Sequence, residues 1–435
     1  MKRREFIRAA GLTGIALPAL GRAATPCPTP QVWIDDDPPV NTDCVAPPPP
    51  GTAPSWFVNM PDKTWTMIAA GGSRSDLSSW QRGSRVADVF PSSSVGGNGP
   101  QYVCEAWNGA CVAQDRGELI LAANGGHGNY AGNEVYACDI RGATPRWTRL
   151  TNPSVASGGS ESNGDYGDGR MRSVHGWHRC TWGAGKVWYA GMDGMYVSGM
   201  WSTRCWSFDR NALGSGPFPV ANAPWRNLGL GLPQSSGVNG EAGCASYDRV
   251  GNRVWSSVGA YENSAGQSFY SINCATNAIS QHNFALQGGR PRWCALAHDL
   301  RVWVLGCPYE GKLELVDLAN PVRTINSVPT GSPSGNEDGV GAVYHQRSRA
   351  IFCWDGYGGN IRKLSIPSNP LTGSWTWSQV TPASGNPVNP SAPSDTGSYS
   401  KFNLIEDMGN GQSAFVVINK TNEPVYVFKI PMAGA

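Results

Sequence analysis

Short apolar runs, separated by turns rich in glycine and polar residues, recur through most of the chain. Residues 119–150 give the clearest example. An apolar run begins at Leu119 and ends at the glycine pair Gly125–Gly126. A second run with alternating polar positions ends at Asp139, and a third contains Trp147. Runs of this kind, broken by glycines and polar turns, predict β-strands joined as an antiparallel meander.

The same order of signals returns along the chain. Apolar second strands are predicted to begin at six positions, namely Leu119, Val187, Val254, Val302, Ile351 and Phe415. Each is preceded by another apolar run that ends in a turn, and each is followed by a third run. The preceding run carries a cysteine at a similar place in four of the units, at Cys111, Cys180, Cys244 and Cys294, which supports the alignment. The chain is therefore expected to repeat one supersecondary unit instead of forming several unrelated domains.

Fourth strands are predicted at residues 145–150, 224–228 and 375–380, and with weaker patterns at 278–284 and 322–327. The sixth unit ends near Pro431 without a fourth strand that contains tryptophan. The isolated strand at residues 63–69, with Trp65, supplies that missing type. A ring of sheets needs such an exchange, because otherwise the last blade would meet the first across an unpaired edge.

These observations predict an all-β fold, a six-bladed β-propeller of four-stranded antiparallel blades in which the N-terminal strand completes the C-terminal blade. The predicted blades span about 87–150, 170–229, 240–285, 290–327, 338–380 and 399–430, the last joined by the strand at 63–69.

The glycine pair, the aromatic-rich third strand and the later tryptophan resemble kelch repeats, as in the central domain of galactose-oxidase-like propellers. The resemblance covers about Ala87–Ile430 and is strongest in the first two units. Successive second strands begin 68, 67, 48, 49 and 64 residues apart by subtraction, around the ~50 residues of a kelch unit. The resemblance implies a fold and says little of function, because one propeller fold serves many tasks.

The N-terminus has the pattern of an export signal. Residues 2–8, KRREFIR, resemble a twin-arginine signal, and a short apolar segment follows at residues 9–20. That segment is shorter than the ~20 residues that span a bilayer. We expect a signal peptide at residues 1–23, a proline-rich arm at 24–54, the propeller at 55–435, and a periplasmic or secreted protein.

The amino-acid composition limits the classes of binding partner to be expected. The formal net charge is +2 and 15% of the 435 residues are charged, against a usual ~25%. With no basic stripe or acidic tail, neither nucleic acid nor a membrane surface is expected as a partner, and the protein is expected to be a monomer. Twelve cysteines in an exported chain predict disulfides. Cys27–Cys44 and Cys104–Cys111 are local candidates, and the other pairings stay open.

In a propeller, the loops between second and third strands and the beginnings of the inner strands converge on one face. Aromatic side chains can pack there on the apolar faces of a sugar, while Arg and carboxylate groups bond its hydroxyl or acid groups. The candidate catalytic residues are His127, Tyr130, Arg172 and His175. The candidate ligand-binding residues are Glu241, Arg292, Tyr309, Glu337, Asp338, Tyr357 and Lys401. The alternative is that these charges form salt bridges between blades.

No metal site is predicted. His175 and His178 flank Gly176–Trp177, and alternation along a strand would place the two histidines on opposite faces. A copper site like that of galactose oxidase would need two His, two Tyr and a thioether-forming Cys, and no pattern in the chain matches it. Whether any cofactor is bound stays open.

Three hypotheses follow. The first is binding of a glycan or cell-envelope ligand at the loop-rich face. The second is a carbohydrate-active enzyme, a lyase or epimerase of acidic sugars. The resemblance to propellers of similar build implies that Arg172 and Arg292 would neutralise the sugar acid while His127 and Tyr130 move the proton. The third is a scaffold whose proline-rich arm binds a partner.

Overall fold

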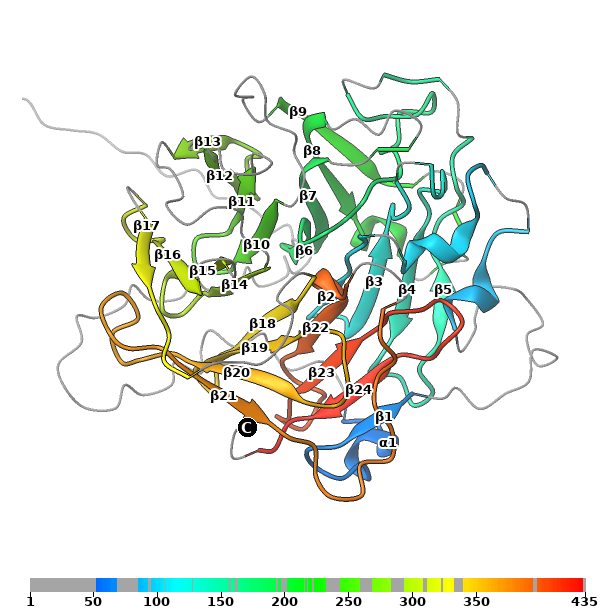
Figure 1. Cartoon of the computed structure of the whole chain (residues 1–435). Coiled ribbons are helices and arrows are strands. Elements are labelled where there is room, and N and C mark those ends of the chain that lie inside the picture. Colours follow the sequence, from blue (N-terminus) through cyan, green and yellow to red (C-terminus); the bar gives the residue numbers. More distant parts are fainter. Residues whose placement is uncertain are drawn as a thin grey trace, which may run out of the picture.

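The computed structural model describes the chain from Thr52 to Met432 except for residues 69–84, 93–94, 106, 127, 156–157, 161–162, 193–194, 197–201, 215, 217, 221–222, 232–242, 259–267, 283–292, 308–310, 322–323, 332–338 and 394–396. Six four-stranded antiparallel sheets are arranged as blades around a central axis (Figure 1). The predicted six-bladed β-propeller is confirmed.

The first blade contains β2 (Cys111–Ala113), β3 (Glu118–Ala122), β4 (Val135–Asp139) and β5 (Trp147–Arg149). The second contains β6 (Cys180–Gly183), β7 (Lys186–Met192), β8 (Ser202–Asp209) and β9 (Trp225–Gly231). The third contains β10 (Cys244–Asp248), β11 (Arg253–Val258), β12 (Ser268–Asn273) and β13 (Ile279–His282).

The fourth blade contains β14 (Trp293–Ala297), β15 (Val302–Cys307), β16 (Lys312–Asp317) and β17 (Thr324–Ser327). The fifth contains β18 (Gly341–His345), β19 (Ala350–Trp354), β20 (Ile361–Ser365) and β21 (Thr376–Val380). The sixth contains β22 (Phe402–Ile405), β23 (Ala414–Val417), β24 (Tyr426–Lys429) and β1 (Trp65–Met67). Helix α1 (Ser55–Val58) and short 3₁₀ turns at Val86–Val89, Pro100–Val103, Asn211–Leu213 and Tyr399–Lys401 complete the described elements.

Strand β1 closes the ring. It pairs antiparallel with β24, and Trp65 lies opposite Phe428. The Trp65 side chain is fully buried, and its indole N–H donates to the Gly359 carbonyl at 2.7 Å. The structure thus confirms the prediction that the N-terminal strand completes the last blade. It removes the unpaired edge that the sixth sheet would otherwise present.

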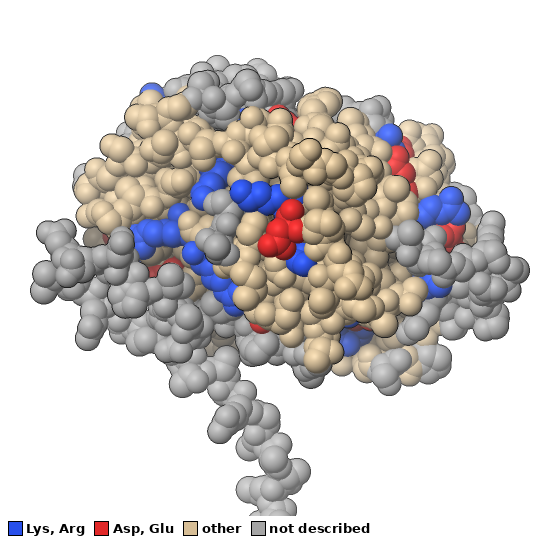
Figure 2. Space-filling view, turned by 90° about the horizontal axis from the view of Figure 1, so that it is seen from below, with Lys and Arg blue, Asp and Glu red and all other residues tan. Residues whose placement is uncertain are grey.

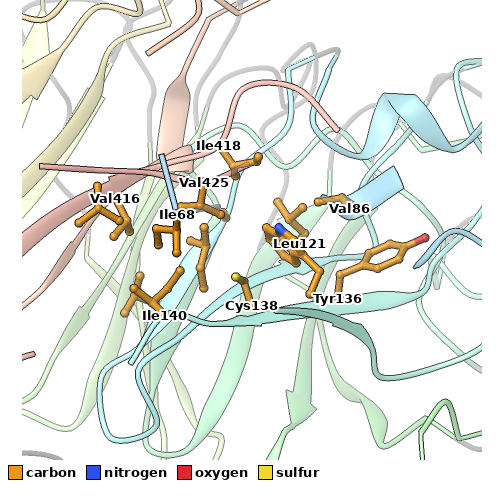
Figure 3. Close-up of a cluster of buried hydrophobic side chains, with 14 of the residues drawn as sticks. Ile68, Val86, Leu121, Tyr136, Cys138, Ile140, Val416, Ile418 and Val425 are labelled. Carbon is orange, nitrogen blue, oxygen red and sulfur yellow. The ribbon is translucent and has the colours of Figure 1, made fainter. Parts of the chain in front are cut away.

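A hydrophobic cluster joins the first and last blades (Figure 3). Leu121 and Tyr136 from the first blade pack there with Val416 and Val425 from the sixth, and with Ile68, the residue that follows β1. All of these side chains are buried. Because these residues come from both ends of the propeller, their burial stabilises ring closure as well as the blades themselves.

The glycine pair that the sequence analysis used has a steric role. Gly125 has φ of 146°, and a Cβ atom there would lie 2.4 Å from the Tyr130 carbonyl oxygen. Glycine is the residue that permits both the backbone conformation and the close approach. The path of the loop between β3 and β4, residues 123–134, therefore depends on this position.

The predicted disulfides are not found among the described residues. None of the nine cysteines whose side chains the structure describes forms a disulfide. Cys104 packs in the cluster between the first and last blades, whereas Cys111 packs against the second blade, so the predicted Cys104–Cys111 pair is wrong for this structure. Cys27 and Cys44 lie outside the described residues.

The described surface agrees with the sparse charge of the sequence. On the face shown in Figure 2, uncharged residues predominate among those described, and Lys and Arg side chains are interspersed between them. Among the residues that the structure describes, no helix is both long and apolar enough to span a membrane.

Candidate functional site

The six innermost strands surround a cavity of about 500 Å³ on the propeller axis. Strands β2, β6, β10, β14, β18 and β22 each contact the next around the ring, and each contributes to the cavity wall. We call the face where these strands begin the start face, and the face where they turn into the second strands the turn face. The cavity reaches from residues just before the inner strands to residues just after them, so it follows the axis of the propeller.

Several polar and aromatic side chains line this axial cavity: Gln114, Asp115, His178, Trp182, Tyr247, Arg249, His298, Tyr344, Asn403 and Glu406. Its remaining wall is formed mainly by small and aliphatic residues of the inner strands. A concave site with a few convergent polar groups on an apolar wall is typical of small-molecule binding, and its volume lies within the ~300–1,000 Å³ of such pockets.

An ion pair crosses the axis near the turn face. Arg249 follows the inner strand of the third blade and Glu406 follows that of the sixth, so the pair joins blades on opposite sides of the ring. The Arg249 guanidinium donates two hydrogen bonds to the Glu406 carboxylate, one of them at 2.8 Å. The Glu406 backbone N–H donates to Gln114 Oε1 at 3.0 Å. Charge and hydrogen bonding therefore link opposite walls of the cavity at this end.

His298 and Tyr344 lie beside that pair. His298 Nε2 lies 3.1 Å from Gln346 Oε1, and the His298 and Tyr344 rings meet edge to face with centroids 5.6 Å apart. Burial, together with the Arg249 charge, lowers the pKa of His298 to about 3. Burial and the neighbouring Asp299 carboxylate raise the pKa of Tyr344 well above its ordinary value. Near neutral pH His298 is therefore an uncharged imidazole and Tyr344 an un-ionised phenol.

Near the start face, three aromatic residues form what we call the aromatic cluster: Trp107, Trp177 and Tyr399. Each lies a few residues before the inner strand of its own blade, and the three blades are neighbours in the ring. The ring centroids of Trp107 and Trp177 are 5.8 Å apart, and those of Trp177 and Tyr399 are 5.1 Å apart. His178, which lines the axial cavity, packs edge to face on Tyr399 at 5.5 Å.

The aromatic cluster has a strained backbone. Trp107, Trp177 and Tyr399 have φ of 53°, 45° and 43°, values that bulky residues adopt rarely because the Cβ atom is crowded. Hydrogen bonds between blades hold this conformation. The Trp177 N–H donates to the Trp107 carbonyl at 2.7 Å, and Ser400 Oγ donates to the Trp177 carbonyl at 2.9 Å. Strain of this kind persists where surrounding contacts over-determine the backbone, and it is common in ligand-binding sites.

Two of the predicted catalytic residues are held in structural networks. The buried Tyr130 hydroxyl donates to Glu134 Oε1 at 2.6 Å, and the Tyr136 hydroxyl donates to the same oxygen at 2.6 Å. Burial and the Glu134 carboxylate raise the pKa of Tyr130. The buried Arg172 guanidinium donates to the carbonyls of Asp165 at 2.8 Å and Gly158 at 3.2 Å.

The other described candidates are dispersed. His175 Nε2 lies 3.2 Å from Asn129 Oδ1, and its ring packs on Trp107 with centroids 5.0 Å apart. The buried Lys401 ammonium donates to the Cys104 carbonyl at 2.6 Å, and burial lowers its pKa to about 8. Tyr357 is 62% exposed. Of the five candidates that the structure describes, none lines the axial cavity, although His175 and Lys401 adjoin the aromatic cluster in space or in sequence.

The remaining candidates, His127, Glu241, Arg292, Tyr309, Glu337 and Asp338, lie outside the described residues, and their roles stay predictions. Sequence reasoning missed Trp107, Arg249, His298 and Glu406. A signal existed for each, because Trp107 precedes an inner strand and the others lie in the turns just after one. Among the described residues, no group of three or more His, Cys, Asp or Glu side chains could hold a metal ion.

The fold and the axial cavity define a six-bladed propeller with a small-molecule-sized site. No protein-family model matches the chain, and no curated protein sequence gives a significant match. Among solved structures the chain is similar to a gluconolactonase from Xanthomonas campestris, at 10% identity over 76% of this chain and 88% of that chain, with a TM-score of 0.43. It is also similar to the major Malassezia sympodialis allergen Mala s 1, at 10% identity over 77% of this chain and 95% of that chain, with a TM-score of 0.44. At such identities and TM-scores these likenesses carry no argument about function.

Proposed function

We propose that this propeller binds a small polyhydroxylated ligand of the sugar class in its axial cavity. The observation that carries the proposal is the cavity itself, which combines apolar walls, aromatic side chains and hydrogen-bonding groups of both charges in about 500 Å³. Sugars have apolar ring faces and a rim of hydroxyl groups, so they suit aromatic surfaces next to directional polar groups.

The aromatic contacts supply the first part of this match. Trp182 and Tyr247, from the second and third blades, line the cavity. Trp182 is only partly buried, and its indole N–H donates to Asp115 Oδ1 at 3.0 Å, which fixes the orientation of the ring. A ring held in this way can pack on a sugar without first losing conformational freedom, and preorganisation of this kind favours binding.

The ion pair supplies the second part. Arg249 is held by Glu406 across the axis, and a sugar acid could replace Glu406 as the carboxylate partner of Arg249. Arginine binds carboxylates through two parallel hydrogen bonds. We therefore favour acidic sugars over neutral ones as ligands of this site.

The test is calorimetric titration with a panel of neutral sugars and the corresponding sugar acids. Trp182→Ala should weaken binding of every ligand by about 10-fold or more, because stacking on an aromatic ring contributes on the order of 1–2 kcal/mol. The matched control is Trp377→Ala, since Trp377 is also partly buried but packs on Trp293, away from the cavity. Equal loss in both variants, or no binding by the wild type, would count against the proposal.

Arg249→Gln separates the two ligand classes. It should reduce affinity for sugar acids while neutral sugars bind as before. Arg253→Gln is the control, because Arg253 donates to Ser271 Oγ at 3.1 Å in the third blade and does not line the cavity. If Arg249→Gln left the preference for sugar acids unchanged, the proposal that Arg249 recognises the sugar carboxylate would be wrong.

A second candidate function is a lyase acting on acidic sugars, favoured by the grouping of His298, Tyr344 and Arg249 at one end of the cavity. Arg249 would neutralise the sugar carboxylate, uncharged His298 would remove the proton next to it, and the Tyr344 hydroxyl would protonate the departing glycosidic oxygen as a carbon–carbon double bond forms. Ultraviolet absorbance of that unsaturated product, abolished in His298→Gln, would establish the activity. Binding of a sugar acid without new absorbance would leave the binding function alone.

We also propose that the chain is exported as a kelch-like propeller after removal of residues 1–23. The arginine pair and the short apolar segment support this proposal. Replacing Arg3 and Arg4 by lysine should leave the uncleaved protein in the cytoplasm, detected by cell fractionation. Continued export of that variant would contradict twin-arginine targeting.

A further inference from the structure

Four of the six inner strands carry a cysteine at a similar position, and these cysteines come together in two pairs. Cys111 and Cys180 pack in one hydrophobic cluster between the first and second blades. Cys244 and Cys294 pack in another between the third and fourth blades. In each case the two inner strands are in contact around the axis.

Within each pair the sulfur atoms are close. The Cys111 and Cys180 thiols are within hydrogen-bonding reach of each other, and so are the Cys244 and Cys294 thiols. The position of Cys294 is further defined by the neighbouring strand, since its Sγ lies 3.4 Å from Ser246 Oγ and 3.8 Å from the Ala245 carbonyl. Cysteines on neighbouring strands that contact each other in this way form a disulfide when their sulfur atoms approach to about 2 Å.

From this geometry we infer that the inner ring is a redox site in which Cys111 pairs with Cys180 and Cys244 with Cys294, giving two disulfides that staple neighbouring blades. The reaction partner is a small disulfide oxidant. One thiolate of a pair attacks the oxidant, displaces one thiol and forms a mixed disulfide. The second thiolate then attacks that mixed disulfide and releases the other thiol. Each pair loses two protons and two electrons, and the oxidant is reduced to two thiols.

The axial cavity provides the access that this chemistry needs. Cys111, Cys180 and Cys294 line it, although each side chain is largely buried. In the second pair, burial raises the pKa of Cys294, but hydrogen bonds with Cys244, Ser246 and Trp303 outweigh it and lower the pKa below the ordinary value. A lowered pKa favours the thiolate form of Cys294, and the thiolate is the form that attacks a disulfide.

Oxidation would have a structural consequence. The disulfides would close loops of 69 and 50 residues by subtraction, and cross-links over loops of this length stabilise a fold by restricting its unfolded chain. They would also join the first blade to the second and the third to the fourth at the cavity wall. The diameter of the cavity would then depend on the redox state.

In the experiment, the folded and fully reduced protein is treated with 2-hydroxyethyl disulfide. The protein is then denatured, its remaining thiols are alkylated, and its peptides are mapped without reduction. We expect linked peptides containing Cys111–Cys180 and Cys244–Cys294, together with a Tm several degrees above that of the reduced protein. Alkylation of all four cysteines in the treated protein would overturn the inference. So would a Cys104–Cys111 link.

Two variants sharpen the result. Cys180→Ser should leave Cys111 open to alkylation while the Cys244–Cys294 link still forms. Cys138→Ala is the matched control, because Cys138 is buried in the third strand of the first blade, within the cluster drawn in Figure 3, and should leave both links intact. If Cys180→Ser does not fold, the wild-type peptide map decides alone. If the Cys180→Ser variant also failed to form the Cys244–Cys294 link, the two pairs would not be independent, contrary to the inference.

Discussion

The two faces of the propeller that border the axial cavity are held together in different ways. Near the turn face, Arg249 and Glu406 meet across the axis beside His298, and charge and hydrogen bonding hold that end together. Near the start face, the aromatic cluster of Trp107, Trp177 and Tyr399 is held by packing, and its backbone is strained at all three residues. The charged end should respond to pH and salt, whereas the aromatic end should respond to changes in side-chain volume and backbone freedom.

This contrast has a consequence for ligand binding. The ion pair can exchange one carboxylate for another at modest cost, because Arg249 and Glu406 keep 22% and 11% of their side chains exposed. The aromatic cluster cannot rearrange without losing its packing and the hydrogen bonds between blades. A ligand in the cavity would therefore meet an exchangeable ion pair near the turn face. Near the start face it would meet His178, a wall residue that packs on the rigid aromatic cluster.

The largest expected effect is at the aromatic cluster. Trp177→Ala should lower the free energy of unfolding by about 3–5 kcal/mol, because it removes a large side chain that is 8% exposed. Urea unfolding followed by circular dichroism measures this loss. Trp177→Gly is the matched variant, since glycine adopts positive φ without the cost that alanine incurs there. The glycine variant should be more stable than the alanine variant by about 1 kcal/mol, and the reverse order would show that the backbone strain is not real.

The next effect is the response of the charged end to pH. Burial and the Arg249 charge lower the pKa of His298 to about 3, so below pH ~6.5 the unfolded chain binds a proton at this residue that the folded protein does not. Stability is thus fully present above pH ~6.5 and is lost as pH falls toward 4. His298 contributes about 1.4 kcal/mol per pH unit. The free energy of unfolding of the wild type should exceed that of His298→Asn by less at pH 5 than at pH 7, and the difference should fall by this slope. Urea unfolding between pH 7 and pH 5 measures it. Parallel curves would contradict a lowered pKa of His298 in the folded protein.

A smaller effect is expected for the ion pair. Glu406→Gln leaves Arg249 without its carboxylate and should cost about 1–2 kcal/mol, a figure reduced from that of a buried pair because both side chains reach solvent. The wild type should also lose stability when salt is raised to 1 M, while the variant should not. Glu423→Gln is the control, since Glu423 forms an exposed pair with Lys420 at 3.6 Å and should change stability by less than about 0.5 kcal/mol. Equal effects of the two substitutions would show that the axial pair behaves as a surface pair.

The smallest effect is expected outside the cavity. Tyr357 is 62% exposed and does not line the axial cavity, so Tyr357→Ala should change the free energy of unfolding by less than about 0.5 kcal/mol and leave ligand affinity unchanged. Calorimetric titration of the variant checks this outcome. A large loss of affinity would move the binding site to the loop that carries Tyr357 and would support the original sequence prediction for that residue.

Sequence reasoning worked best where one strand pattern repeats. Alternating apolar residues and turn glycines located all six inner strands, and the unpaired strand containing Trp65 predicted how the ring closes. The same reasoning was poor at locating the site. The sequence places Tyr130 just after a glycine turn and Arg172 at the beginning of a predicted inner strand. The structure instead uses Tyr130 to satisfy Glu134, and Arg172 to satisfy the loop carbonyls of Asp165 and Gly158. A polar residue in a turn can serve either purpose, and its position in the sequence does not distinguish them.

By itself, the sequence determined the number of blades, their strand order and the exchange of the N-terminal strand into the last blade. These follow from local periodicity and from the need to pair every sheet edge. Only the tertiary structure decided that Arg249 reaches Glu406 across the axis, that Cys111 faces Cys180, and that Trp107, Trp177 and Tyr399 pack together. The reason is physical: these contacts join separate blades, and their distances depend on how the sheets pack around the axis.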